Sequence, residues 1–234
     1  MAFLSQRSTE SELMDAPEAS EQELVKVLEE LETVNKWLGG YAPLYDAYKR
    51  IGLHRHPLTI MDLGSGGGDV LRKTAEWLHK HGLKNYRLIG VDNHPIMTEY
   101  ASSQSDEWQN MEFVTYDAFD ERLKEYQPDI VLNNLFCHHF TDASLPQLLL
   151  WMKDLAGKAV IINDLHRHWF AYYSIMILTK LISGSRFVKY DAPLSVARSL
   201  TREEWRHTLQ EANIANYSLR WMWAWRWQVI INAY

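Results

Sequence analysis

The chain alternates short apolar runs with segments in which apolar residues recur at helical spacing. Five runs are typical of buried strands: 60–63, 86–91, 111–115, 129–132 and 158–163. Helical patterns such as 70–78 and 145–152 separate them, and two further strand-like runs, 217–223 and 226–233, follow near the end. This alternation predicts an α/β fold with a largely parallel sheet.

The first quarter of the chain predicts a helical extension. Residues 1–19 are polar and without period, which predicts a loose arm. A capping box at 20–23 then begins a helical pattern that ends at the glycine pair 39–40. This helix can pack on the domain, cover a substrate as a lid or form a dimer contact. We assign residues 1–56 to an N-terminal arm and helical lid.

The run at 60–63 breaks into a glycine-rich turn that begins the next helical pattern. Glycines at alternate positions allow positive φ values and let a flat ligand lie against the backbone, and the N–H groups of a helix N-terminus face the same turn. Asp62 and Asp69 flank the turn, and their charges disfavour a pyrophosphate. The ammonium and sulfonium groups of S-adenosylmethionine (SAM) would be attracted instead. The pattern therefore favours SAM over a dinucleotide.

This D-x-G-x-G-x-G pattern resembles the first motif of the class I SAM-dependent methyltransferases, and the likeness continues in family order over residues 57–234. It implies a SAM-binding domain with a Rossmann-like, doubly wound, seven-stranded sheet whose last strand is reversed. Asp92, at the end of the second strand, is expected to hold the ribose diol. The resemblance implies an adenine contact for Asp117 and Ala118. The expected cofactor residues are Asp62, Gly64, Ser65, Gly66, Asp92, Asn93, Asp117, Ala118, Asn133 and His138.

Composition and charge restrict the kinds of molecule that the protein can bind. The net charge of −6 and the scattered lysines and arginines give no basic stripe for nucleic acid, so a small neutral or cationic acceptor fits better. The single cysteine, Cys137, excludes an internal disulfide, and no signal sequence is recognised, so we expect a cytoplasmic protein. We expect a monomer or a homodimer. The apolar run 169–182 is shorter than the about 20 residues that cross a bilayer. It predicts a helix, within an insertion over about 166–198, that either walls a substrate pocket or adds to the core.

Four histidines follow two of the predicted strands: His138, His139, His166 and His168. The ligand crevice of a parallel sheet lies at such strand ends, and histidine titrates where a phenol or enol oxygen needs a base. We predict His166 as the general base with His139 next, no metal ion, and substrate contacts from His168, Tyr172 and Arg198. The alternative is a divalent metal ion held by Asp164, His166 and His168, which alternate along the chain.

Segments 12–15, 166–168 and 195–198 resemble bacterial small-molecule O-methyltransferases associated with polyketide-type biosynthesis. This resemblance implies methyl transfer from SAM to a hydroxyl of a small aromatic or polyketide-derived molecule. Two alternatives stay open: a C-methyltransferase of quinone-pathway type, and a noncatalytic SAM-binding module. Turnover of any phenol in a panel would argue against the module.

Overall fold

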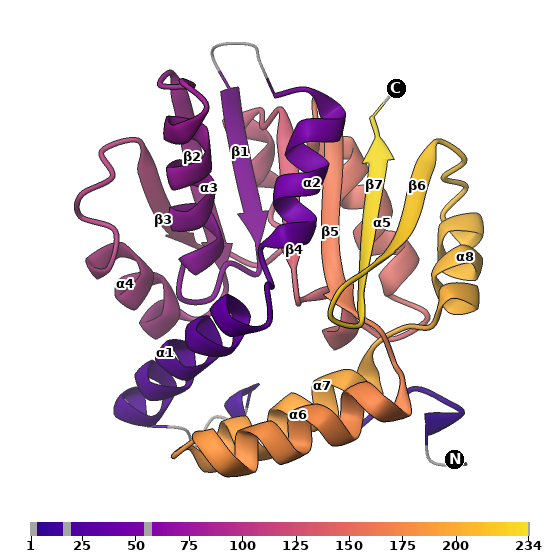
Figure 1. Cartoon of the computed structure of the whole chain (residues 1–234). Helices are drawn as coiled ribbons and strands as arrows, with labels where there is room; N and C mark the ends of the chain where they lie inside the picture. Colours follow the sequence, from indigo (N-terminus) through magenta and orange to yellow (C-terminus); the bar gives the residue numbers. More distant parts are fainter. Residues whose placement is uncertain (1–3, 16–19, 54–57, 234) are drawn as a thin grey trace.

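A seven-stranded sheet in the order β3-β2-β1-β4-β5-β7-β6 forms the centre of the molecule (Figure 1). The computed structural model describes residues 4–15, 20–53 and 58–233. The strands are β1 (Leu58–Leu63), β2 (Tyr86–Asp92), β3 (Met111–Thr115), β4 (Ile130–Asn134), β5 (Ala159–Leu165), β6 (Tyr217–Met222) and β7 (Arg226–Asn232). Strands β1 to β5 pair in parallel, and β7 runs antiparallel to both of its neighbours. The predicted Rossmann-like sheet with a reversed last strand is confirmed.

Helices cover both faces of this sheet. The α-helices are α1 (Glu21–Trp37), α2 (Ala42–Ile51), α3 (Asp69–Lys80), α4 (Pro95–Ser103), α5 (Leu145–Leu155), α6 (Trp169–Ile182), α7 (Arg186–Arg198) and α8 (Arg202–Glu211). The described residues also form the short 3₁₀ turns η2 (Leu13–Asp15), η3 (Glu121–Tyr126) and η4 (Cys137–His139). One buried core joins α5 and α8 to one face, and a second joins α2 and α3 to the other. The sheet is therefore apolar on both sides, as its near-continuous hydrophobic strands require.

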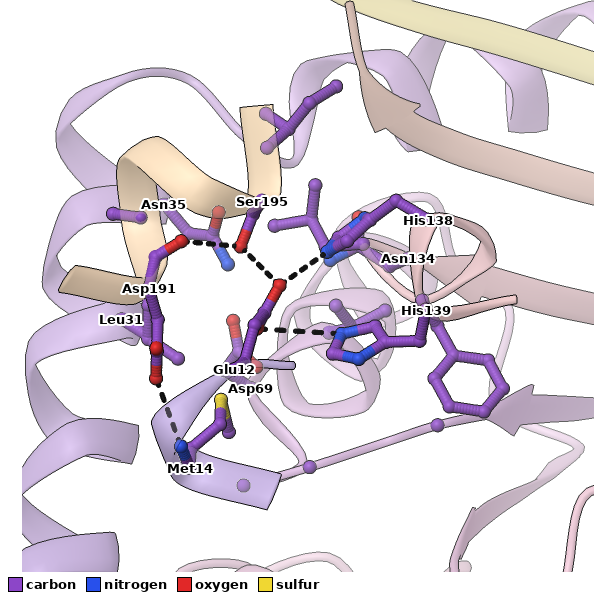
Figure 2. A pocket seen from close by; sticks show the side chains of 18 of the residues that line it. Glu12, Met14, Leu31, Asn35, Asp69, Asn134, His138, His139, Asp191 and Ser195 are labelled. Carbon is purple, nitrogen blue, oxygen red and sulfur yellow. Dashed lines mark hydrogen bonds and ion pairs between the residues drawn. The ribbon is translucent and has the colours of Figure 1, made fainter. Parts of the chain in front are cut away.

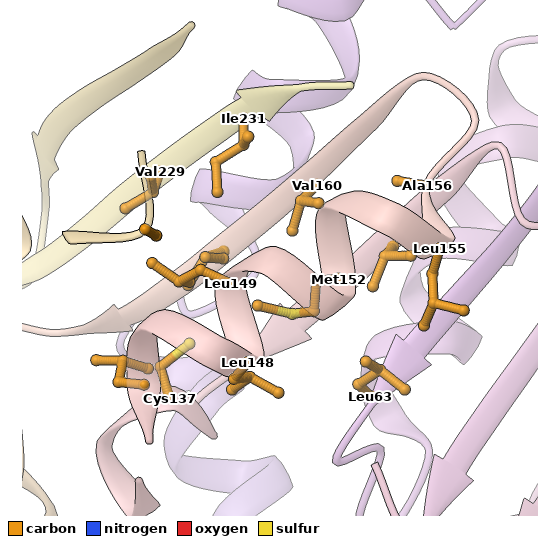
Figure 3. Close-up of a cluster of buried hydrophobic side chains, with 14 of the residues drawn as sticks. Leu63, Cys137, Leu148, Leu149, Met152, Leu155, Ala156, Val160, Val229 and Ile231 are labelled. Carbon is orange, nitrogen blue, oxygen red and sulfur yellow. The ribbon is translucent and has the colours of Figure 1, made fainter. Parts of the chain in front are cut away.

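The spacing of apolar residues in α5 shows how one of these cores is built (Figure 3). Leu148, Leu149 and Met152 face β4, β5 and β7 and are fully buried with Val160 and Val229. Burial of one such side chain contributes roughly 1.5–3 kcal/mol. This rigid packing fixes the strand ends from which the functional side chains project.

The N-terminal arm, in contrast, is held on the domain by hydrogen bonds that its sequence does not predict. The backbone N–H groups of Leu13 and Met14 donate to the Asp191 carboxylate, and Arg7 donates to the carbonyls of His138 and Phe140. The prediction of a loose arm is therefore wrong for residues 4–15, because tertiary hydrogen bonds replace the missing hydrophobic period. The predicted boundary between residues 56 and 57 lies outside the described residues.

Helices α6 and α7 form a cover beyond the carboxyl ends of the strands (Figure 1). The chain leaves the sheet after Leu165 and returns at Leu200, whose backbone pairs with His166. The two helices pack on each other, and α7 also contacts α1 and η2. Within the part of the chain that the structure describes, every helix is too short or too polar to cross a membrane.

Candidate active site

A cavity of about 770 Å³ lies between the carboxyl ends of the strands and the helical cover. Its strand-end half is formed by residues 62, 64–67, 69–70, 91–94, 97, 116–119 and 134–136. Its helical half is formed by Glu12 and Met14 of the arm, by helices α1, α6 and α7, and by residues 138–140. Residues 223–225 between β6 and β7 and Arg226 at the start of β7 complete it. The size is typical of a site that encloses a small organic ligand.

The glycine turn of the strand-end half excludes side chains at two positions. A Cβ on Gly64, whose φ is +75°, would lie 2.4 Å from the Phe136 ring, and one on Gly68 would lie 2.6 Å from Phe113. The Asp92 carboxylate accepts the backbone N–H of Gly66 at 3.0 Å, so β2 and the turn are tied together. Gly66 itself lines the cavity, where a Cβ would meet only a side-chain carbon at 3.8 Å. The backbone is thereby open to a ligand.

Asp62 is a buried carboxylate that lacks a counter-ion in the described structure. It is 1% exposed, and neither of its oxygens has a hydrogen-bond partner among the described residues. Burial raises the pKa of Asp62 well above its usual range, and the charges of Asp69 and Asp92 raise it further. The hydroxyl of Ser65, which also lines the cavity, has no partner there either. A cationic ligand would compensate this site, which fits the ammonium and sulfonium groups of SAM.

Other predicted cofactor residues lie along the same half of the cavity. Asn93, Asp117 and Ala118 line it. The Asp117 carboxylate accepts the backbone N–H of Phe119 at 2.8 Å, and the carbonyl of Ala118 accepts the indole N–H of Trp151 at 2.6 Å. Both residues are held by local contacts at the end of β3, where the family resemblance implies the adenine.

The helical half borders a buried row of alternating charges, of which Figure 2 shows Glu12 and His138. His138 lies between Asp164, whose Oδ1 is 2.7 Å from Nδ1, and Glu12, whose Oε1 is 3.5 Å from Nε2. The Ser195 hydroxyl donates to Glu12 at 2.8 Å. Burial alone lowers the pKa of His138, but the two carboxylates outweigh it and raise the pKa to about 9. Burial opposes ionisation of Glu12 as well, yet His138 lowers the pKa of Glu12 to about 2. The imidazolium and both carboxylates are therefore charged at neutral pH.

His139 lies beside this row and lines the cavity. Its Nε2 is 3.8 Å from Glu12 Oε2, and its side chain is 22% exposed (Figure 2). In the described residues, Glu12, His138 and His139 are the group whose possible ligand atoms lie close enough to hold a metal ion, all within 4.8 Å of one another. The sequence-based alternative of Asp164, His166 and His168 is not brought together, because Asp164 is paired with His138.

Five predicted site residues do not line the cavity, as far as residues 4–15, 20–53 and 58–233 define it: Asn133, His166, His168, Tyr172 and Arg198. The His166 ring packs edge-on against Trp227 with centroids 4.9 Å apart, and burial lowers the pKa of His166 to about 4. His168 is the N-cap of α6 and accepts the N–H of Phe170. The strand pleat explains the displacement, since successive side chains after β5 alternate between opposite faces.

The remaining residues of this group have structural contacts. Asn133 is fully buried and donates to the carbonyl of Leu63 at 3.2 Å, whereas the neighbouring Asn134 lines the cavity. Arg198 donates to two backbone carbonyls in η4. Tyr172 is half-buried in α6 and stacks edge-on against the next tyrosine. Arg198 thus positions the histidine turn without reaching the cavity.

Sequence reasoning did not assign Glu12, Ser195 or Arg226 to the site. Glu12 stands in a polar segment without period, and its only signal was the resemblance of segment 12–15. Ser195 belongs to a helix that the sequence did not place beside the arm. Arg226, at the start of β7, is 3% exposed, and its Nη2 donates to Asn35 at 3.3 Å. Nothing local in the sequence marks an arginine in a strand as a cavity residue.

Comparison with known proteins agrees with this geometry. Residues 60–156 match the family model described as a methyltransferase domain, and no curated protein sequence matches the chain. The fold is similar to that of human N-acetylserotonin methyltransferase in complex with SAM (14% identity, TM-score 0.64, 91% of this chain and 56% of that one). It is also similar to an O-methyltransferase family 2 protein from Planctomyces limnophilus in complex with apigenin (14% identity, TM-score 0.64, 94% of this chain and 63% of that one). A third similar structure is that of a SAM-dependent methyltransferase from Aquifex aeolicus, with 14% identity and a TM-score of 0.65. The similarity covers 90% of this chain and 98% of that one.

The chain spans a little over half of the length of the first two of these proteins, and identities of this size show a shared fold alone. The family match is independent of the fold comparison and covers the glycine turn, Asp92 and the strand ends that form the cavity. Residues 60–156 therefore match a methyltransferase domain, and the chain has the fold of SAM-dependent methyltransferases.

Proposed function

We propose that the enzyme transfers the methyl group of SAM to a hydroxyl of a small aromatic or polyketide-derived molecule, with His139 as general base. The observation that carries the proposal is the position of His139, which lines the cavity from η4, the turn that follows β4, beside the Glu12 carboxylate. The surrounding wall is largely apolar, with Leu31 of α1, Leu178 of α6 and Val196 of α7. Such a wall suits an aromatic or otherwise apolar acceptor.

In this proposal, Asp62 and Asp92 bind the cofactor, and His139 and Glu12 take part in proton transfer. Asp92 would hold the ribose and Asp62 the ammonium group, and bound SAM supplies a methyl group on a positively charged sulfur. The strand-end half thereby orients the cofactor toward the helical half. His139 would take the hydroxyl proton of the acceptor, because a phenol is largely protonated near neutral pH. Glu12 would stabilise the imidazolium that forms.

His139 fits this role better than the other three histidines. His138 already carries a proton at neutral pH, since its pKa is raised to about 9 by the flanking carboxylates. His166, which the sequence favours, and His168 do not line the cavity in the described structure. We therefore transfer the proposed role of base from His166 to His139.

The structural neighbours support an oxygen acceptor. One of them is named as an O-methyltransferase family protein and is in complex with apigenin. The C-methyltransferase and the noncatalytic SAM-binding module are the alternative outcomes.

The test is incubation of the purified chain with SAM and a panel of phenols that includes apigenin, followed by mass spectrometry and NMR of the product. We expect a mass gain of one methylene unit and an O-methyl resonance. His139→Ala should lower kcat about a hundredfold or more, with unchanged affinity for S-adenosylhomocysteine. His166→Ala, the matched control, should stay within a few-fold of the parent.

Other results would redirect the assignment. A new C–methyl bond would show the C-methyltransferase, and SAM binding without turnover of any acceptor would support the module. Equal losses in the two variants would remove the distinction between His139 and His166.

A further inference from the structure

The Arg226 guanidinium is a buried cation that contacts Asn35 and Gly40 on one side. Arg226 stands opposite Leu165 in the β5–β7 ladder, at the carboxyl end of β5, and lines the cavity. Its Nη2 donates to Asn35 Oδ1, and a Cβ on Gly40 would lie 3.1 Å from the same nitrogen. The close approach of Gly40 and Asn35 leaves this guanidinium no room on that side.

The other donors of Arg226 lack an acceptor. Nε and Nη1 are buried and have no hydrogen-bond partner within the described residues. The nearby acidic groups are committed elsewhere, since Asp164 pairs with His138 and the Tyr41 hydroxyl donates to Asp69. A buried guanidinium with free N–H groups is strongly unfavourable unless an anion or a carbonyl binds it. Arginine donors match the geometry of a carboxylate particularly well.

Asp62 presents the opposite case in the same cavity. Both of its oxygens are buried without a partner in the described chain, and the residue is 1% exposed. One orphaned carboxylate and one orphaned guanidinium therefore line one cavity, and neither has the other as a hydrogen-bond partner. Their opposite charges are those that the ammonium and the carboxylate of a zwitterionic ligand would compensate.

We propose that Arg226 is the carboxylate-binding residue of the cavity. Two bound molecules can supply that carboxylate: the methionine portion of the cofactor, or an acidic acceptor. The opposite charge of Asp62 favours the cofactor. The acceptor alternative rests on the proposed function, whereas the cofactor alternative depends only on SAM binding.

The experiment compares the parent with Arg226→Met and Arg226→Lys by isothermal titration with two probes. S-adenosylhomocysteine has the amino-acid portion, and 5′-methylthioadenosine keeps the adenosine and thioether but lacks that portion. If Arg226 holds the cofactor, Arg226→Met should bind S-adenosylhomocysteine at least tenfold more weakly and methylthioadenosine equally well. Arg226→Lys should lie between the two, and retained methylthioadenosine binding shows that the variants are folded.

The acceptor alternative has its own result. In protein saturated with S-adenosylhomocysteine, 4-hydroxybenzoate should then lose affinity in Arg226→Met while 4-hydroxybenzamide, its uncharged analogue, should not. Unchanged binding of S-adenosylhomocysteine and of 4-hydroxybenzoate would overturn the proposal. An equal loss for S-adenosylhomocysteine and methylthioadenosine would also overturn it, because Arg226 would then only support the shape of the cavity. A chain without methyltransferase activity would leave the cofactor titrations unaffected.

Discussion

The two halves of the cavity are built in different ways. The strand-end half uses residues that follow β1, β2 and β3 directly, so each position is set by one strand and the turn after it. The helical half combines Glu12 of the arm with His138 of η4 and Ser195 of α7, each of which is more than a hundred residues from Glu12 in the chain. Its geometry therefore depends on tertiary contacts between separate segments.

The charges differ in the same way. In the helical half, His138 carries its proton between two carboxylates, and the row compensates itself internally. In the strand-end half, the Asp62 carboxylate is buried without such compensation in the described residues. A charge that the protein satisfies itself stabilises the fold, whereas an uncompensated charge is available for a ligand. We therefore expect changes at Asp62 and Asp92 of the strand-end half to affect cofactor binding, and changes in the charged row of the helical half to affect stability and turnover.

The largest expected effect is a pH dependence of stability from His138. Its pKa is about 9 in the folded chain and about 6.5 in an exposed histidine. Because the folded-state pKa is the higher one, the stabilisation is complete below pH 6.5 and is lost as the pH rises through 9. This difference corresponds to about 3 kcal/mol of unfolding free energy.

Urea unfolding at pH 6 and at pH 9.5 measures this contribution when the parent is compared with His138→Gln. The parent should lose about 3 kcal/mol more than the variant between the two pH values. Since Asp62 and other groups titrate in both proteins, only the difference between them reports on His138. Identical pH profiles would contradict the charged state assigned to the row.

The second prediction concerns the strand-end half. Asp92→Ala should weaken binding of S-adenosylhomocysteine at least tenfold, because hydrogen bonds to a charged group contribute about 1.5 to 3 kcal/mol each. The variant also loses the bond to Gly66 N–H that shapes the glycine turn. Asp92→Asn, which keeps one carbonyl acceptor, should show a smaller loss in the same titration. Unchanged affinity in both variants would place the ribose elsewhere.

The smallest expected effect is that of Glu12→Gln. This change removes the carboxylate beside His138 and His139 but keeps the shape of the side chain, so we expect kcat to fall about three- to tenfold with unchanged affinity for S-adenosylhomocysteine. Glu10→Gln, on the exposed part of the same arm, should have no effect. Steady-state kinetics with a phenol that the parent methylates provides the measurement.

A chelator separates two explanations of a Glu12 effect. If Glu12, His138 and His139 act as the charged row described above, EDTA should leave the rate of the parent unchanged. Loss of activity with EDTA and recovery with a divalent cation would instead indicate that these three residues bind a metal ion.

The strand-end residues could be predicted because strand order and alternation leave few possibilities. In a parallel sheet, all carboxyl ends meet at one edge, so Asp62, Asp92 and Asp117 were expected near one another from their positions after apolar runs. The histidines were predicted less well by the same rule. His139 lines the cavity, but His166 lies on the other face of the chain after β5 and packs against Trp227. Strand ends are fixed by pattern, while the direction of a side chain in the next loop is not.

The apolar periodicity and the glycine pattern were sufficient to predict the strands and the glycine turn, because both act over a few neighbouring residues. The family resemblance implied the reversed last strand. Tertiary packing was needed to bring Glu12 to His138, Arg198 to η4 and Arg226 into the cavity. These contacts join segments far apart in the chain, and their energies depend on burial and on neighbouring charges. A local pattern of polar residues contains neither quantity.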